Sequence, residues 1–239
     1  MQSVRIGSQV LVSLLLLSLG CYSQSPKSPH DSIISVQELS MSAKAQREYE
    51  KGTRLLAEGN AQASIEHFLR VVEERPRYYG PYHNLAMAYL HLGQYDAAEE
   101  NFQKSIDLAG VGYAPSLYGL AMVLYSKEQF AEAETLALRA FVLEPSAGGK
   151  LCLGTVQIAL GHLPDAERSA HDAIQLDPAL ADAYFLLATI HDRQHNPSAV
   201  VADIQTYLKL APQGSLRTGA QALLDRAQQA LSSESASLH

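Results

Sequence analysis

The sequence contains no tryptophan, only two cysteines and no cluster of basic residues. Its 18 lysines and arginines are outnumbered by 25 aspartates and glutamates, which gives a formal net charge of -7. Because nucleic-acid binding needs concentrated positive charge, this balance argues against DNA or RNA as a partner. Cys21 and Cys152 lie far apart in the sequence, so they predict neither a disulfide framework nor a cysteine-based zinc site.

The sequence also lacks the motifs that mark common active sites. Residues 148–150 read Gly-Gly-Lys, but a phosphate-binding loop requires glycine where Glu144 stands and Ser or Thr where Leu151 stands. No Gly-x-Ser-x-Gly motif is present. The numerous carboxylates fall on expected helices, where a solvated face explains them. We therefore expect no enzyme activity and no cofactor.

The amino terminus has the pattern of a bacterial export signal. Arg5 precedes the apolar stretch 10–19, which at ten residues is too short to span a bilayer. Residues 18–21, Ser-Leu-Gly-Cys, resemble a lipobox, in which the cysteine is lipidated and becomes the first residue, although the leucine stands one place later than usual. Cleavage after Ser23 by an ordinary signal peptidase, or an apolar start without a targeting role, remains open.

On the lipobox interpretation, residues 1–21 are an export signal and Cys21 anchors a periplasmic lipoprotein to a membrane of a Gram-negative-type bacterium. Residues 22–42 form the next segment. Its first part, 22–31, is polar with two prolines and is expected to be a tether. The short apolar strip 33–39 is expected to dock on the first helix, with a free, partner-seeking strip as the alternative.

Residues 84–108 predict a helical hairpin that recurs along the chain. Apolar and small residues follow helical spacing in both halves, which are separated at Leu92-Gly93-Gln94. The positions expected to pack are Leu85, Ala86, Tyr89 and Leu92 in the first half, and Tyr95, Ala98, Phe102, Ser105 and Ile106 in the second. The pattern returns at steps of 34, 35, 33 and 34 residues, in blocks that begin at Ala45, Tyr79, Ala114, Ala147 and Ala181.

Stacked in this register, the blocks resemble the tetratricopeptide repeat (TPR) family. Its pattern of Leu followed by Gly or Ala appears as Leu85-Ala86, Leu120-Ala121 and Leu153-Gly154. The close-contact position of the second helix holds Ser64, Ala98, Ala133, Ala166 and Val200. The resemblance implies an all-α, right-handed α-solenoid of five helical hairpins. Their expected limits are 45–78, 79–113, 114–146, 147–180 and 181–212.

A capping helix is predicted after the fifth repeat, over residues 213–231. Its apolar positions, from Leu216 to Leu231, form one stripe, and polar residues such as Arg217 and Asp225 lie opposite. Such a helix covers the apolar face that a solenoid exposes at its last repeat. The serine-rich residues 232–239 are expected to be a loose tail.

In the resembling family, the first helix of each hairpin lines a concave groove that binds partner proteins. Carrying the register over, this resemblance assigns to the groove Tyr49, Thr53, His83, Asn84, Met87, Tyr118, Met122, Tyr125, Leu151, Thr155, Phe185 and Thr189. The set lacks the Lys and Arg that chaperone-binding members use to hold a carboxylate, and offers tyrosines and methionines instead. We expect a peptide or helix of a partner protein to bind there. The alternative is that part of this set packs on neighbouring first helices or on the apolar strip 33–39. The chain as a whole resembles the type IV pilus pilotins and, less closely, outer-membrane assembly lipoproteins, which implies a cell-envelope scaffold or assembly factor.

In the alternative function, the protein binds a small ligand or a metal, or is an accessory subunit of an enzyme, and it uses His191, His195 or Cys152. His191 and His195 are one helical turn apart, a spacing that can chelate a metal, but no glutamate follows His191 as the zincin motif requires. His191 also takes a core-facing position of its repeat. Cys152 lies among apolar neighbours, which favours a buried thiol over a reactive one. We therefore expect no metal site.

Overall fold

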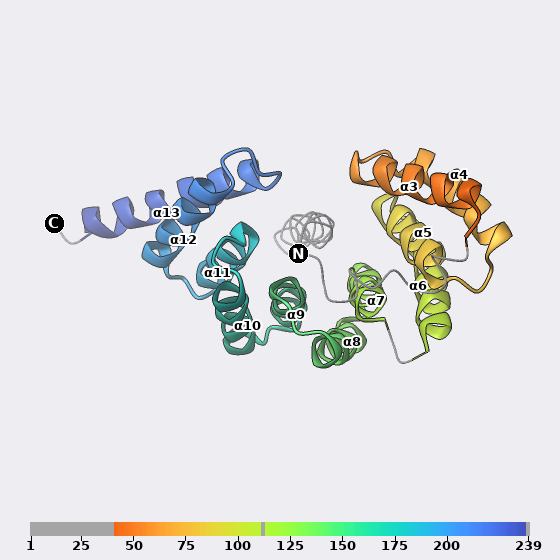
Figure 1. Cartoon of the computed structure of the whole chain (residues 1–239). Helices are drawn as coiled ribbons and strands as arrows, with labels where there is room; N and C mark the ends of the chain where they lie inside the picture. The colour runs from red at the N-terminus through yellow and green to blue at the C-terminus, as the bar shows by residue number, and fades with distance from the viewer. Residues whose placement is uncertain (1–40, 111–112, 238–239) are drawn as a thin grey trace. The chain divides into compact units, whose positions relative to one another are not determined.

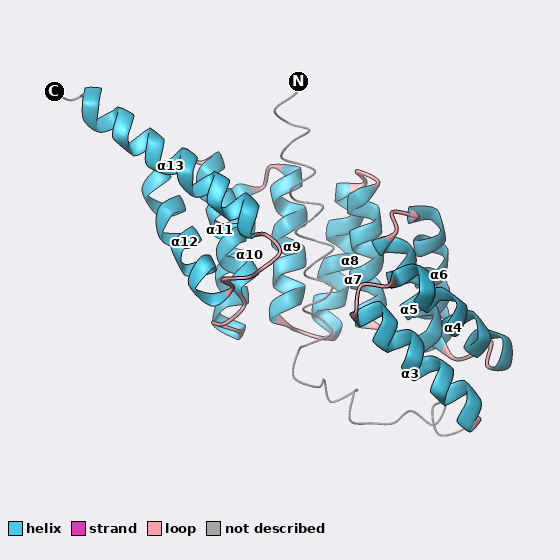
Figure 2. Cartoon of the chain, turned by 90° about the horizontal axis from the view of Figure 1, so that it is seen from above, coloured by secondary structure: helices cyan, strands magenta, loops and turns pink. Residues whose placement is uncertain are grey.

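The computed structural model describes residues 41–110 and 113–237, and every regular element in these ranges is an α-helix (Figure 1; Figure 2). The predicted export signal, tether and apolar strip, residues 1–40, lie outside the described residues. The helices are α3 (Ala43–Ala57), α4 (Ala61–Glu74), α5 (Tyr79–His91), α6 (Tyr95–Ala109), α7 (Ala114–Ser126), α8 (Phe130–Leu143), α9 (Ala147–Leu160), α10 (Leu163–Leu176), α11 (Ala181–Arg193), α12 (Pro197–Leu210) and α13 (Arg217–Ser237). None of them is long and apolar enough to cross a bilayer.

The described helices form two compact units that divide after Glu144. The amino-terminal unit contains the hairpins α3–α4, α5–α6 and α7–α8. The carboxy-terminal unit contains the hairpins α9–α10 and α11–α12, followed by α13. Within each unit, the second helix of one hairpin packs on the first helix of the next. The predicted all-α architecture of five hairpins and a final helix is confirmed.

Local sequence signals explain where several helices begin. Four of the predicted block starts coincide with the first residues of α5, α7, α9 and α11. Ser42, Ser146 and Asn196 are N-caps whose side chains accept hydrogen bonds from backbone amides three residues on. Helices α7, α10 and α12 carry proline in the first turn, where the missing N–H removes no helical bond.

Each of the five hairpin turns contains one residue with positive φ. Three are glycines, Gly59, Gly93 and Gly161, which adopt this region without steric strain. The other two are Glu128, with φ of 62°, and His195, with φ of 57°. Because L-residues are disfavoured in the left-handed region, the third and fifth hairpins tolerate a local strain that the others avoid.

Small residues allow the two helices of a hairpin, and neighbouring hairpins, to approach closely. The close-contact residues of the second helices are fully or almost fully buried, Ala98 and Ala133 among them. In the first helices, a Cβ on Gly52 would lie 2.8 Å from Cε1 of Phe68, and one on Gly154 would lie 2.8 Å from Cδ2 of Leu186. Large side chains therefore occupy the space left by glycine.

Helix α13 packs its apolar stripe on α12. Leu216, just before its first turn, and Ala220 and Leu223 within it are buried. The helix continues to Ser237, whereas the sequence pattern predicted a loose tail from residue 232, so the structure differs there. Serine hydroxyls in this stretch donate to backbone carbonyls one turn earlier, as Ser232 does to Gln228 over 2.9 Å. These bonds satisfy the hydroxyls within the helix and so remove their competition with it.

Candidate partner-binding surface

Three first helices of the amino-terminal unit, α3, α5 and α7, carry eight of the predicted groove residues. Helix α5 contacts both α3 and α7, so residues far apart in the sequence lie on neighbouring helices. We call the side formed by these three helices the first-helix surface. Its predicted members are Tyr49, Thr53, His83, Asn84, Met87, Tyr118, Met122 and Tyr125.

The accessible members of this set lie on α3 and α5. Thr53 is exposed, and Tyr49, Asn84 and Met87 are half-buried. The Thr53 hydroxyl donates to the Tyr49 carbonyl over 2.9 Å, so it is satisfied within its own helix. The amide of Asn84 makes no side-chain hydrogen bond within the described part of the chain. A half-buried amide with free donors and a free acceptor is suited to bind a polar ligand group.

The predicted members on α7 are buried instead. Tyr118 is 4% exposed, Met122 2% and Tyr125 4%. The Tyr118 hydroxyl donates to the Glu144 carbonyl over 3.3 Å, and the Tyr125 ring packs edge-on against Phe130 at 5.3 Å. Both contacts join α7 to the two ends of α8, the second helix of the same hairpin. The sequence offers a signal for this burial, because α7 is apolar on nearly every face.

The carboxy-terminal unit places its predicted members mainly in packing positions. Leu151, Thr155 and Phe185 are buried, and Thr189 is half-buried. The hydroxyls of Thr155 and Thr189 donate to carbonyls four residues earlier, over 2.8 Å and 2.9 Å. The Phe185 ring packs edge-on against Tyr207 at 5.6 Å. Thr189 is therefore the most accessible of the four.

The structure adds a row of aromatic rings that the sequence pattern did not single out. Ring centroids lie 5.7 Å apart for Tyr49 and Tyr78, 5.7 Å for Tyr78 and Tyr79, and 4.9 Å for Tyr79 and Tyr113. Tyr78 and Tyr113 are the N-cap residues of α5 and α7. An aromatic residue directly before successive first helices was the signal that could have found them. The row links α3, α5 and α7 along one side of the unit.

His83 belongs to a polar chain that runs between three helices. Its Nδ1 lies 2.9 Å from Oγ of Ser116, whose hydroxyl donates to Oγ of Ser105 over 2.9 Å. Its ring packs edge-on against Phe102 and Tyr113. Burial lowers the pKa of His83 to about 4, so the imidazole is neutral at neutral pH. This predicted groove residue therefore supplies no positive charge for an anionic partner.

The residues of the alternative function are not brought together. His191 Nδ1 lies 2.6 Å from Oδ2 of Asp203, and its Nε2 lies 3.7 Å from Oε1 of Glu167. His195 lies in the turn after α11. Cys152 is buried in α9, and burial raises the pKa of its thiol to about 12, which keeps it protonated. Among the described residues, no three His, Cys, Asp or Glu side chains are grouped as metal ligands.

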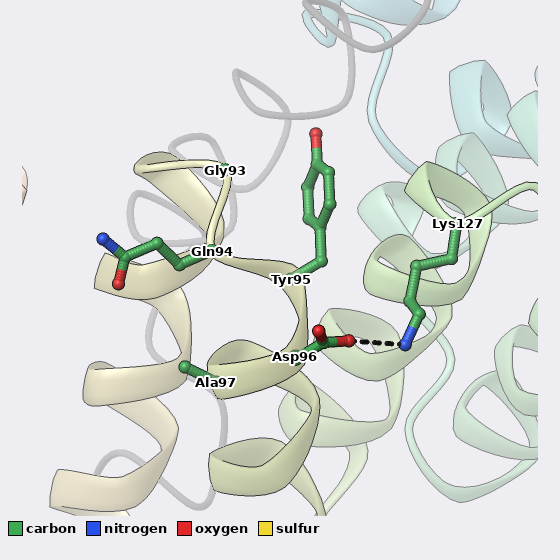
Figure 3. A pocket seen from close by; sticks show the side chains of 6 residues that line it. All are labelled: Gly93, Gln94, Tyr95, Asp96, Ala97 and Lys127. Carbon is green, nitrogen blue, oxygen red and sulfur yellow. Dashed lines mark hydrogen bonds and ion pairs between the residues drawn. The ribbon is translucent and has the colours of Figure 1, made fainter.

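An open depression of about 360 Å³ lies at the turn between α5 and α6 (Figure 3). Lys127 reaches into it, and its Nζ lies 2.8 Å from both Oδ1 of Asp96 and Oε2 of Glu99. These two hydrogen bonds hold the pKa of Lys127 above its usual value. Because two carboxylates already neutralise the one cation among the described residues that line it, the depression is poorly suited to an anionic ligand.

Comparison with known proteins agrees with the repeat architecture. Three family models, each described as tetratricopeptide repeat, match residues 55–106, 81–141 and 152–215. A tetratricopeptide repeat and J domain-containing co-chaperone, DNJ1, of Cryptococcus neoformans var. grubii is 31% identical over 93 residues. That match covers 39% of this chain and 17% of the co-chaperone.

Solved structures share the fold, TTC0263 and PilW among them. TTC0263, a thermophilic TPR protein of Thermus thermophilus, has a TM-score of 0.69 at 23% identity and covers 75% of this chain and 98% of its own. PilW, described as a widely conserved type IV pilus biogenesis factor, has a TM-score of 0.66 at 12% identity and covers 81% and 94%. The family models together cover more than half of the sequence. The chain therefore belongs to the tetratricopeptide repeat family.

Proposed function

We propose that this protein is a non-catalytic scaffold that binds an extended segment of a partner protein on the first-helix surface, over α3 and α5. The observation that carries the proposal is the pair Asn84 and Met87 on α5. The two residues are three positions apart, so they share one helix face. Both are half-buried, which leaves part of each side chain accessible.

Asn84 and Met87 offer complementary contacts to a peptide. The Asn84 amide can donate to a backbone carbonyl and accept from a backbone N–H of the same extended segment. Met87 is flexible and polarizable, so it adapts to apolar side chains of different shapes. The exposed Thr53 and half-buried Tyr49 on α3 extend the surface toward the amino terminus. With His83 neutral, the surface favours an uncharged, partly apolar segment.

A scaffold without catalysis is consistent with the chemistry of the described residues. Cys152 is held as a buried, protonated thiol, and His191 is engaged by carboxylates. The Lys127 amine is engaged by Asp96 and Glu99. Each of these side chains is therefore buried or engaged in an ion pair, an arrangement that does not favour proton or group transfer.

The cell envelope is the proposed place of action. Arg5, the apolar stretch 10–19 and Cys21 support export with lipid attachment, and the polar segment 22–31 supports a tether between the anchor and the repeats. An anchored scaffold of this kind is suited to assist the assembly of envelope proteins. The likeness to PilW agrees with such a role at the level of the fold.

Site-specific photo-cross-linking in cells tests the proposed surface. A photoreactive amino acid at position 87 is expected to capture a specific protein, and Asn84→Ala is expected to reduce that capture severalfold. Gln103 is exposed on α6, the second helix of the same hairpin, and provides the matched cross-linking position. Asn101→Ala is the matched amide control, because Asn101 donates to the Ala97 carbonyl of its own helix over 2.8 Å. Capture at position 103 but not at 87 contradicts the proposal.

A further inference from the structure

The outer face of α8 differs from that of the other four second helices. In α8, the stripe formed by Ala131, Thr135, Leu138 and Val142 contains no charged residue and is exposed along its length. The equivalent stripes each contain charge: Gln62, Glu66, Leu69 and Glu73 in α4; Asp96, Glu100, Gln103 and Asp107 in α6; Pro164, Arg168, His171 and Gln175 in α10; and Ser198, Ala202, Gln205 and Lys209 in α12. We call the α8 set the outer stripe.

Large apolar side chains on the outer stripe are left in contact with solvent. Val142 is 80% exposed, Leu138 46% and the adjacent Leu143 47%. In the repeat register, the Val142 position holds Glu73, Asp107, Gln175 and Lys209 in the other copies. A position that is polar in four copies and apolar in the fifth is not required to be apolar by the hairpin itself.

The spacing of the outer stripe suits packing against another helix. Successive members are separated by four, three and four residues, which is the period of a coiled-coil seam. Thr135 fits such a seam, because its hydroxyl donates to the Ala131 carbonyl over 3.0 Å and needs no other partner. A partner helix can therefore cover the stripe without burying an unsatisfied hydroxyl.

The flanking charges identify the partner. Glu132 and Arg139 are exposed on the same side of the stripe, seven residues apart, and neither makes an ion pair within the described residues. In an antiparallel pair of two α8 helices, Ala131 lies opposite Val142 of the second copy, and Thr135 lies opposite Leu138. Glu132 of each copy then lies beside Arg139 of the other. The face is thus complementary to itself in shape and in charge.

We propose that the outer stripe of α8 is an isologous contact between two copies of this protein. Fourteen residues give a helix about 20 Å long, so the contact buries less than the roughly 800 Å² per partner of a typical stable complex. The dimer is therefore weak and concentration-dependent, with a dissociation constant on the order of 10 to 100 μM. The contact leaves the first-helix surface of each copy free for its own partner.

Sedimentation equilibrium of the full chain, in density-matched detergent, tests the proposal. The parent is expected to shift from monomer to dimer across this concentration range. Val142→Glu buries a carboxylate opposite Ala131 and is expected to raise the dissociation constant at least about tenfold. Leu176→Glu is the matched control, because Leu176 is 54% exposed on α10 outside the equivalent stripe, and it should leave association unchanged.

A charge swap distinguishes a second copy from any other occupant. Glu132→Arg and Arg139→Glu should each weaken the dimer severalfold, because like charges then meet across the two-fold axis. The double variant restores both pairs with exchanged signs and should recover the parent dissociation constant. The proposal is overturned if the parent stays monomeric, or if Val142→Glu leaves the dissociation constant unchanged. It is also overturned if the double variant associates as weakly as the single variants. If Val142→Glu lowers the melting temperature at a protein concentration well below the parent's dissociation constant, where both proteins are monomeric, the stripe packs within one chain and the proposal is overturned.

Discussion

Gly119 on α7 lies directly against the ring of Phe102 on α6, and a Cβ at position 119 would overlap the ring atoms Cζ and Cε1. Phe102 is fully buried, so its ring has little space into which to move. We therefore expect Gly119→Ala to destabilise the protein by about 1 to 3 kcal/mol through overpacking. Chemical denaturation measures the loss. Phe102→Leu makes room for the added methyl, so the double variant should lose less than the sum of the two single losses. Additive losses would contradict this contact.

His83 should make stability depend on pH. Burial lowers its folded-state pKa from 6.5 to about 4, so the unfolded chain binds the proton more readily. The contribution of the neutral, buried His83 ring to the free energy of unfolding is fully present above about pH 6.5. It is lost as the pH falls from there toward 4, by up to about 3 kcal/mol. Burial also lowers the pKa of His91, which adds in the same direction.

The readout for His83 is the slope of unfolding free energy against pH, since a substitution at this site also changes stability at every pH. His83→Gln should make the slope between pH 6.5 and 4 clearly shallower than in the parent. An unchanged slope would show that His83 is not the group responsible.

The pair His191 and Asp203 should stabilise the α11–α12 hairpin. Their side chains are 14% and 16% exposed, and the Nδ1 to Oδ2 distance is 2.6 Å. Burial raises the pKa of Asp203, and the hydrogen bond from His191 opposes that rise. Asp203→Ala removes the partner of a mostly buried imidazole and should lower the free energy of unfolding by about 1 to 3 kcal/mol.

Asp192→Ala is the matched control for Asp203. Asp192 pairs with Arg226 over 3.2 Å at the surface, where both side chains are substantially exposed. Its removal should change stability by less than about 1 kcal/mol. Equal losses for the two variants would contradict the distinction between buried and surface pairs.

Two substitutions in the hairpin turns test the backbone strain of a positive φ, one by adding strain and one by relieving it. Gly93 has φ of 70°, and nothing lies within 4 Å of an added Cβ. Gly93→Ala therefore adds backbone strain without adding a clash with another residue. We expect it to lose about 1 kcal/mol, whereas Glu128→Gly should gain up to about 1 kcal/mol by relieving the strain at φ of 62°. Thermal melting of both variants checks the opposite signs. A loss in both would place the strain elsewhere in the turn.

Lipid attachment predicts a change in cell fractionation. Cys21→Ala should move the protein from the membrane fraction to the soluble fraction, because the acyl chains supply most of the membrane affinity. Cys152→Ala removes a buried thiol within α9 and should leave the partition unchanged. Unchanged membrane partition of Cys21→Ala would contradict lipidation.

Much of the fold was predictable from the sequence because the repeat multiplies a weak local signal. Leu85-Ala86 followed by Ala98 would indicate little alone, but five copies at nearly constant spacing identified the hairpins. The first residues of α5, α7, α9 and α11 followed from the same register. The end of α13 was missed, because serine-rich composition favours a loose tail whereas hydroxyl-to-carbonyl bonds let the helix continue.

The candidate site was less predictable because register assigns a helix face but not what covers it. His83 was assigned to a partner from its position, yet its ring packs against Phe102 and bonds Ser116 from another hairpin. Tyr118 and Met122 were assigned in the same way, and both are buried. Asn84 and Met87, from the same set, remain partly accessible.

The sequence by itself determined the all-α class, the five hairpins and the close-contact positions, because helical periodicity and the spacing of small residues are local properties that repeat. Only the tertiary structure decided which side chains of the first helices meet one another and which remain accessible. Burial depends on contacts between residues such as His83 and Ser116, which lie in different hairpins and whose approach no local pattern encodes.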